Sequence, residues 1–151
     1  MAPRRDSNTM DLLSWQPPAA PAAFAPEVVR AATLRATLAK GVGAALKESD
    51  KGREVIALEM GDYLGEVVPK SMLDAYASES REEHVISLVR FIALIHATRD
   101  YRLLQLLADQ FGLAVIEARY VPAIEQAVLD DKIAELTQRR NVANKKWRGP
   151  A

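Results

Sequence analysis

Few side chains in this sequence could perform chemistry on a substrate. The 151 residues include no cysteine and only two histidines, His84 and His96. The histidines fall on different predicted elements without metal-ligand spacing, and a disulfide framework or a Cys-based zinc site is impossible without cysteine. No Gly-x-Ser-x-Gly motif supplies a nucleophile, and adjacent acids such as Asp130 and Asp131 lie at surface spacings typical of solvated carboxylates. We therefore expect no enzymatic activity, no cofactor and no metal.

The charged side chains offer a second kind of chemistry, which is recognition of nucleic acid or of a charged protein. Twenty basic and twenty acidic residues give a net charge of zero, which argues against coating nucleic acid through bulk electrostatics. The charges are nevertheless segregated. Residues 28–48 carry four basic side chains against one acidic, residues 49–83 carry nine acidic against four basic, and five basic but no acidic residues follow Glu135.

The elements that must position these charges are predicted to be helices. Alanine and leucine are abundant and only 6% of the residues are aromatic, which favours an all-α protein with a compact helical bundle. We expect a disordered Pro/Ala-rich arm at residues 1–26, a helical domain at 27–118, and a C-terminal helix with a basic tail at 119–151. The sequence shows no secretory signal and no apolar run long enough for a membrane span, so we expect a cytoplasmic protein.

Apolar spacing and capping residues predict six helices. They are expected at residues 27–47, 53–63, 69–78, 88–97, 101–111 and 122–140. Ser87 is the preferred N-cap of the fourth helix, although the sequence around Ser80 also matches a capping box. Gly65 and Gly112 are expected to end helices. The last helix is long and has an imperfect heptad pattern, which indicates self-association.

The sequence EMGDYLGEVVPKSMLDAYASES, residues 59–80, predicts a tight corner between two helices. A helix-turn-helix needs a small residue where its helices cross, a glycine in the turn, and apolar residues that lock the second helix. Gly61 suits the crossing and Gly65 suits the turn. The apolar residues expected to hold the second helix in place are Val67, Met72 and Ala75.

Residues 54–115 resemble helix-turn-helix regulatory proteins of temperate phages and prophages. The resemblance lies in the stretches EVIALEMGDYLGEVVPKSMLDAYASESREEH and ISLVRFIALIHATRDYRLLQLLADQFGLAV, the second of which contains an "ATxD" corner at residues 97–100. It implies a DNA-binding transcriptional regulator encoded by a prophage. The sequence departs from the pattern at Gly52, where Ser or Thr often caps the first motif helix, and at Arg99, where glycine is often found.

If the protein binds double-stranded DNA, its polar residues divide into two groups. The expected base contacts come from the second motif helix: Lys70, Ser71, Asp74 and Ser78. The expected phosphate contacts are Arg30, Arg35, Lys51, Arg53, Lys145, Lys146 and Arg148. A homodimer through residues 122–140 would present two such surfaces. The alternative is a non-enzymatic adaptor whose acidic corner binds a basic phage protein, such as a transposition or replication protein.

Overall fold

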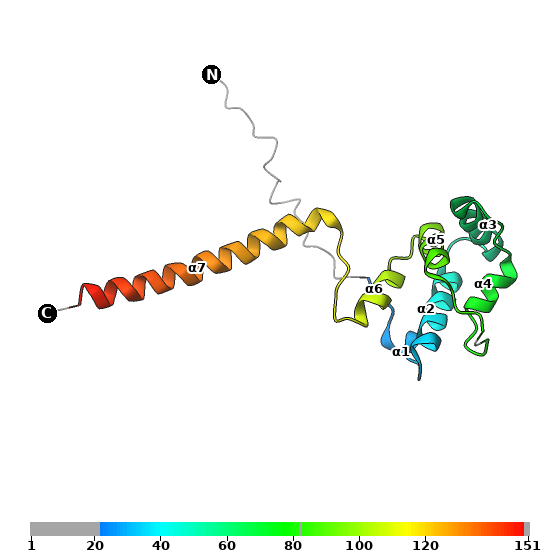
Figure 1. Cartoon of the computed structure of the whole chain (residues 1–151), viewed down its shortest axis with the longest axis horizontal. Helices are drawn as coiled ribbons and strands as arrows, with labels where there is room; N and C mark the ends of the chain where they lie inside the picture. Colours follow the sequence, from blue (N-terminus) through cyan, green and yellow to red (C-terminus); the bar gives the residue numbers. More distant parts are fainter. Residues whose placement is uncertain (1–21, 82, 150–151) are drawn as a thin grey trace, which may run out of the picture. The chain divides into compact units, whose positions relative to one another are not determined.

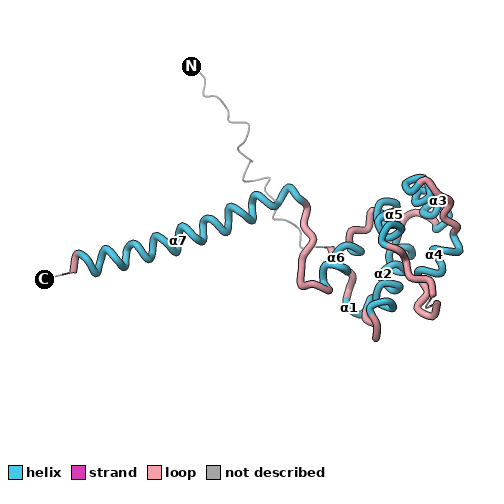
Figure 2. The backbone as a smooth tube through the Cα atoms, in the orientation of Figure 1, coloured by secondary structure: helices cyan, strands magenta, loops and turns pink. Residues whose placement is uncertain are grey.

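The computed structural model describes residues 22–81 and 83–149, and every regular element within these ranges is helical (Figure 1, Figure 2). The predicted all-α class is therefore confirmed. The chain divides into two compact units, one formed by residues 19–115 and one that contains residues 116–151. Residues 1–21 of the expected arm lie outside the described part of the chain.

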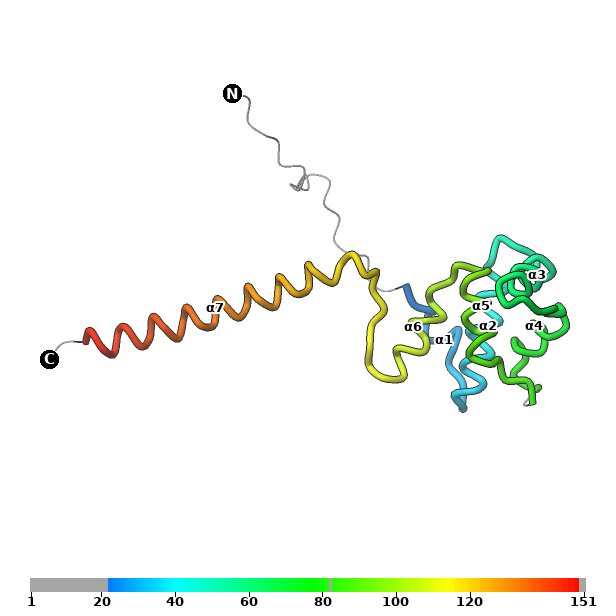
Figure 3. Tube along the Cα trace, turned by 45° about the horizontal axis from the view of Figure 1, so that its top comes forward, coloured from blue at the N-terminus to red at the C-terminus, as the bar shows by residue number. Residues whose placement is uncertain are grey.

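The first unit is built from six helices. They are α1 (Pro26–Val29), α2 (Leu34–Glu48), α3 (Arg53–Leu64), α4 (Lys70–Tyr76), α5 (Leu88–Thr98) and α6 (Arg102–Asp109). In both ribbon and tube views α3, α4 and α5 lie side by side (Figure 1, Figure 3).

Helix α5 is apolar almost all round, but it buries only one side and exposes Leu88, Val89 and Ile92 on the other. Its residues Phe91, Leu94 and Ile95 are buried together with Ala93 and Ala97. They join a single core to which the other helices contribute large, fully buried side chains. Those side chains are Val42, Ile56, Met60, Leu73 and Leu103.

The first predicted helix is interrupted. Residues 27–47 were expected to form one helix, but α1 ends at Val29 and α2 begins only at Leu34. Thr33 has an extended backbone, and its side-chain oxygen accepts a hydrogen bond from the Ala36 N–H at 3.2 Å. A threonine hydroxyl that caps a new helix competes with continuation of the preceding one, which explains the break.

Core packing extends to the N-terminal side of the expected arm boundary at residue 26. Phe24 is buried in the core, and the Arg102 guanidinium carbon lies 4.4 Å from the centroid of its ring. Because a buried aromatic ring stacked against a cation stabilises the fold, the ordered unit begins before Pro26.

The predicted helix ends agree with local capping chemistry at several positions. Ser87 caps α5 by accepting a hydrogen bond from the Arg90 N–H at 3.4 Å, as expected. Gly112, which follows α6, has the left-handed φ of 66° that favours glycine. The third predicted helix was expected to run to about Ser78, but α4 ends at Tyr76.

Beyond residue 115, the short 3₁₀ helix η1 (Ala118–Tyr120) leads into α7 (Val121–Trp147). Helix α7 has 27 residues and continues past the predicted end at residue 140. Its surface carries ion pairs between neighbouring turns, from Lys132 and from Arg139 to Glu135, each at 2.6 Å. Within the described ranges, no helix combines the length and the apolar character that crossing a membrane requires.

Arg99 is the one residue other than glycine with positive φ in the described part of the chain, at 58°. A side chain in this left-handed conformation costs about 1 kcal/mol relative to glycine. We therefore expect Arg99→Gly to raise the free energy of unfolding by about 1 kcal/mol in urea titrations followed by circular dichroism. Arg99→Ala is the control, because it removes the same side chain and keeps Cβ. Equal stability of the two variants would contradict a backbone origin of the effect.

Candidate nucleic-acid interface

Helices α3 and α4 meet in a corner that depends on two glycines. Gly65 follows α3 with a left-handed φ of 70°, and the N–H groups of Gly65 and Glu66 donate to the Gly61 carbonyl oxygen at 2.8 and 3.2 Å. A Cβ on Gly61 would lie 2.7 Å from the Glu66 carbonyl oxygen, which is backbone and part of the turn. The predicted role of Gly65 in the turn is confirmed, whereas the close neighbours of Gly61 are Glu66 and Val68 of the turn and not residues of α4.

The apolar residues that hold α4 in place differ from the prediction at one position. Ala75 is buried and Met72 packs against the core, as expected, but Val67 is 89% exposed and the neighbouring Val68 is buried. The chain between Glu66 and Pro69 is not helical. Successive side chains of an extended segment point to opposite sides, so only one of the two valines can face inward. The prediction for Val67 is therefore wrong, and Val68 takes its place.

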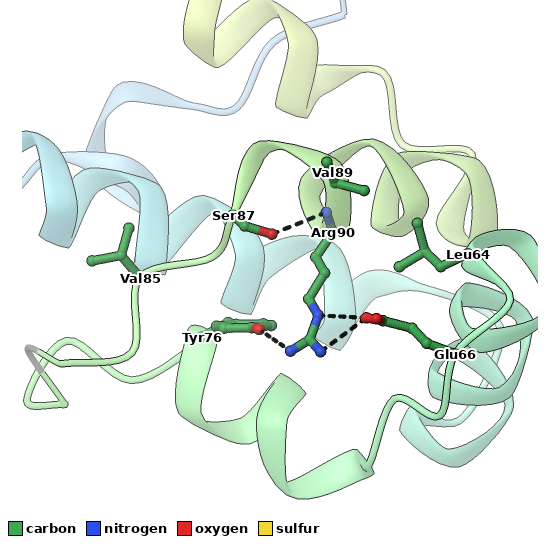
Figure 4. Close-up of a pocket in the computed structure, with 7 residues that line it drawn as sticks. All are labelled: Leu64, Glu66, Tyr76, Val85, Ser87, Val89 and Arg90. Atoms are coloured by element: carbon green, nitrogen blue, oxygen red, sulfur yellow. Dashed lines mark hydrogen bonds and ion pairs between the residues drawn. The ribbon is translucent and has the colours of Figure 1, made fainter.

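Arg90 of α5 connects the turn to the end of α4 (Figure 4). Its Nε and Nη2 donate to Glu66 Oε1 at 3.0 and 2.9 Å, and its Nη1 donates to the Tyr76 hydroxyl oxygen at 2.7 Å. The hydrogen bonds to Tyr76 and then to Glu66 raise the pKa of Arg90. Arg90 was not among the predicted functional residues. The feature of the sequence that could have indicated Arg90 is its position, since it is a charged residue in the first turn of an otherwise apolar helix.

The N-terminal end of α4 is exposed to solvent. Pro69, Lys70 and Ser71 are all exposed, and Lys70 Nζ lies 2.8 Å from Glu54 Oε1 at the start of α3. The hydrogen bond with Lys70 lowers the pKa of Glu54, and the same bond raises the pKa of Lys70. Both groups are therefore charged at neutral pH. Lys70 is presented at the surface with a carboxylate beside it.

Two further predicted cations also contact carboxylates. Arg53 forms an ion pair with Asp74, one of the predicted base-contacting residues. Lys51 Nζ donates to Glu59 Oε2 at 2.7 Å and to the Ala97 carbonyl oxygen at 2.8 Å, which ties it to the C-terminal end of α5. The structure thus brings Lys70, Arg53 and Asp74 together near the start of α3, whereas Lys51 serves a separate contact.

The other residues predicted in the first unit are spread over its surface. Ser71 and Arg30 are exposed. Ser78 lies beyond the end of α4 and is half-buried, with its Oγ 3.0 Å from that of Ser80, so the prediction that it belongs to the second motif helix is wrong. Arg35 is half-buried and lines the same small depression as Ser78.

The predicted phosphate contacts of the tail lie in the second unit. Lys145 and Lys146 occupy the last turn of α7, and Arg148 is its C-cap residue. All three are exposed. Cations in the last turn also stabilise the helix, because they face the negative end of its dipole.

A shallow apolar depression of about 440 Å³ lies beside the corner. Leu58 and Val67, which contribute to its walls, are 65% and 89% exposed. Two carboxylates, Asp62 and Glu66, also line it. The remaining lining residues are Ala57, Gly61, Gly65 and Val68. This surface joins exposed apolar side chains to negative charge, a combination suited to a protein partner.

No group of three or more histidine or acidic side chains in the described ranges could hold a metal ion. The chain has no match among family models, curated proteins or solved structures.

Proposed function

We propose that the protein is a prophage-encoded transcriptional regulator that binds double-stranded DNA through the α3–α4 corner. The observation that carries this proposal is the exposed N-terminal end of α4, with Lys70 and Ser71, after a turn that Gly61 and Gly65 keep tight. Helix-turn-helix proteins present the start of their second helix to base edges in the major groove. The proposal assigns neither a catalytic residue nor a cofactor, and it places the protein in the cytoplasm.

The electrostatics of the corner set a condition on this proposal. Lys70 and Arg53 are paired with Glu54 and Asp74, so the corner supplies little net positive charge for phosphates. Most of the nonspecific affinity must then come from elsewhere. The exposed cations Lys145, Lys146 and Arg148 provide such a source, and Arg30 and Arg35 of the first unit are further candidates.

Base recognition by Lys70 and Ser71 can be tested by selecting bound duplexes from a pool of random sequences. The full-length protein is expected to enrich a sequence motif, because Lys70 and Ser71 can hydrogen-bond to base edges. The double variant Lys70→Ala and Ser71→Ala should bind the pool with affinity reduced by a factor of about 10 or less, and should enrich no motif. An identical motif from the double variant would rule out base contacts by these residues.

The second candidate function is a protein-interaction adaptor, favoured by the apolar depression with Asp62 in its wall, where the other carboxylate, Glu66, pairs with Arg90. An exposed apolar surface next to carboxylates suits a partner segment with an apolar side chain followed by lysine or arginine. A phage transposition or replication protein with a basic segment would fit this description.

One substitution separates the two functions, because only DNA binding at the start of α4 should respond to it. Glu54→Gln removes the carboxylate beside Lys70 and keeps nearly the same shape. If the corner faces DNA, affinity for duplex should rise by about 3- to 10-fold, because a negative charge near the phosphates is lost and Lys70 is released. A basic protein bound in the apolar depression should keep its affinity, because Glu54 does not line that depression. Fluorescence anisotropy with a labelled duplex measures the first effect, and unchanged or weaker duplex binding would contradict the proposed function.

A further inference from the structure

Helix α7 is long and has no buried residue in its own unit (Figure 1, yellow to red). An isolated helix in water is only marginally stable unless an apolar face packs against a partner. Its exposed large apolar residues are Val121, Ile124, Val128, Leu129, Ile133, Leu136, Val142 and Trp147. Leu129, Ile133 and Leu136 are between 52% and 62% exposed. Among the residues that the structure describes, none covers the apolar surface of this helix.

The apolar residues follow the spacing of a helix-pairing face. Leu129, Ile133 and Leu136 are separated by steps of four and three residues, and the same steps lead on through Arg140 to Ala143 and Trp147. Alternating steps of three and four keep side chains on one seam of a coiled coil. The alternating steps of three and four residues are interrupted between Val128 and Leu129, which are adjacent in the sequence. The heptad pattern is therefore imperfect over the whole helix.

The charges of α7 are divided between its two halves. From Val121 to Glu135 there are four acidic residues and one basic residue, whereas from Leu136 to Trp147 there are four basic residues and no acidic one. The acidic residues are Glu125, Asp130, Asp131 and Glu135, and the basic residues of the second half are Arg139, Arg140, Lys145 and Lys146. A single helix thus carries two complementary surfaces.

We propose that α7 pairs in antiparallel orientation with α7 of a second copy of this chain. Antiparallel pairing places the acidic half of each helix beside the basic half of its partner, whereas parallel pairing would oppose acid to acid and base to base. Antiparallel helix dipoles add to the preference. A second copy is the favoured occupant because one helix supplies both halves of the charge pattern. The inference does not depend on DNA binding.

The first test is the oligomeric state of the full-length chain, measured by sedimentation equilibrium. The wild type should dimerise at micromolar concentration. The double variant Leu129→Gln and Ile133→Gln should raise the dimer Kd at least about 100-fold, since two side chains leave the apolar seam. Glutamine is a good helix former, so the far-ultraviolet circular dichroism should lose helicity only as far as the unpaired α7 frays. A monomeric wild type or a fully dimeric variant would overturn the proposal.

The second test determines orientation and leaves the seam intact. The chain contains no cysteine, so a single cysteine at Ala123 can carry a spin label for pulsed electron resonance. In an antiparallel pair the two labels lie near opposite ends of helices about 40 Å long, which predicts a separation of about 30 Å, or about 20 or 40 Å if the register slips by one heptad in either direction. A parallel pair would give about 15 Å or less. Mixing Ala123→Cys with Asn144→Cys should add a short distance as the matched control, and a short distance from Ala123→Cys alone would overturn the orientation.

The third test concerns the charges themselves. Replacing Arg139, Arg140, Lys145 and Lys146 by glutamate should weaken dimerisation about 10- to 100-fold at low salt, because two acidic halves then face each other. Adding lysine at Glu125, Asp130, Asp131 and Glu135 in the same chain should restore the dimer. If the eightfold variant pairs no better than the fourfold variant, the charge pattern does not determine pairing.

Discussion

Replacement of Gly61 by alanine is expected to lower the free energy of unfolding by up to about 2 kcal/mol. The new Cβ would lie 2.7 Å from the carbonyl oxygen of Glu66, and that oxygen belongs to the turn that Arg90 holds through the Glu66 side chain. The backbone must shift, and overpacking of this kind commonly costs about 1–3 kcal/mol. This cost exceeds the roughly 1 kcal/mol that alanine gains over glycine inside a helix. Urea unfolding followed by circular dichroism measures the difference.

Gly43 is the matched control, because it also lies within a helix. A Cβ there would meet the Ala77 carbonyl oxygen at 3.6 Å and the Ala77 Cβ at 3.7 Å, which are ordinary contacts. Gly43→Ala should therefore raise stability by about 0.5–1 kcal/mol. The two alanine substitutions should have opposite signs. A common sign would show that the close approach at Gly61 does not control the corner.

The second large effect is expected from the tail. Replacement of Lys145, Lys146 and Arg148 by glutamine should weaken binding to every duplex by about 10- to 100-fold at low salt. It should also reduce the slope of log affinity against log salt by up to about 3, because each phosphate contact contributes about one unit. Sequence preference should not change, since phosphates carry no base information. Anisotropy titrations on two unrelated duplexes measure all three quantities.

Two controls accompany the tail variant. Lys132→Gln removes an exposed cation that is paired with Glu135 on the same helix, and it should leave affinity within about 2-fold. Sedimentation of the tail variant separates lost phosphate contacts from lost dimerisation, since two of its three sites also belong to the basic half of α7. Unchanged affinity and salt slope in a variant that still dimerises would exclude the tail from phosphate binding.

The parts of the fold that follow from local chemistry were predictable from the sequence. Ser87 caps α5, Gly65 ends α3, and the apolar residues of α5 are central to the core, because each depends on a few neighbouring residues. The interruption of the first helix could not be read from periodicity. Its cause is a competing cap at Thr33, and a mid-helix threonine carries little sequence signal.

The candidate site was predictable in outline but not in its electrostatics. Gly61 and Gly65 identify the corner because a Cβ at Gly61 would meet the turn backbone and the positive φ of Gly65 favours glycine. The pairing of Lys70 with Glu54, of Arg53 with Asp74, and of Arg90 with Glu66 joins residues that are 16 to 24 positions apart. Such contacts depend on how α3, α4 and α5 pack, so a charge count along the sequence could not reveal them.

Those pairs change the physical role of the corner. The start of α4 presents two polar side chains, Lys70 and Ser71, at an exposed helix end. Most of the charges around it are paired with opposite charges. Under the proposed function, affinity for DNA would therefore rest mainly on cations outside the corner, and specificity would rest on Lys70 and Ser71. This division of roles makes the salt dependence of binding the decisive quantity.

The measurement that tests DNA binding most directly is a salt titration of the full-length protein with a labelled duplex, followed by fluorescence anisotropy. If three tail cations contact phosphates, affinity should fall by about 40-fold or more between about 50 and 200 mM salt. Absence of binding at about 50 mM salt, or binding that does not change over this range, would contradict the proposed function.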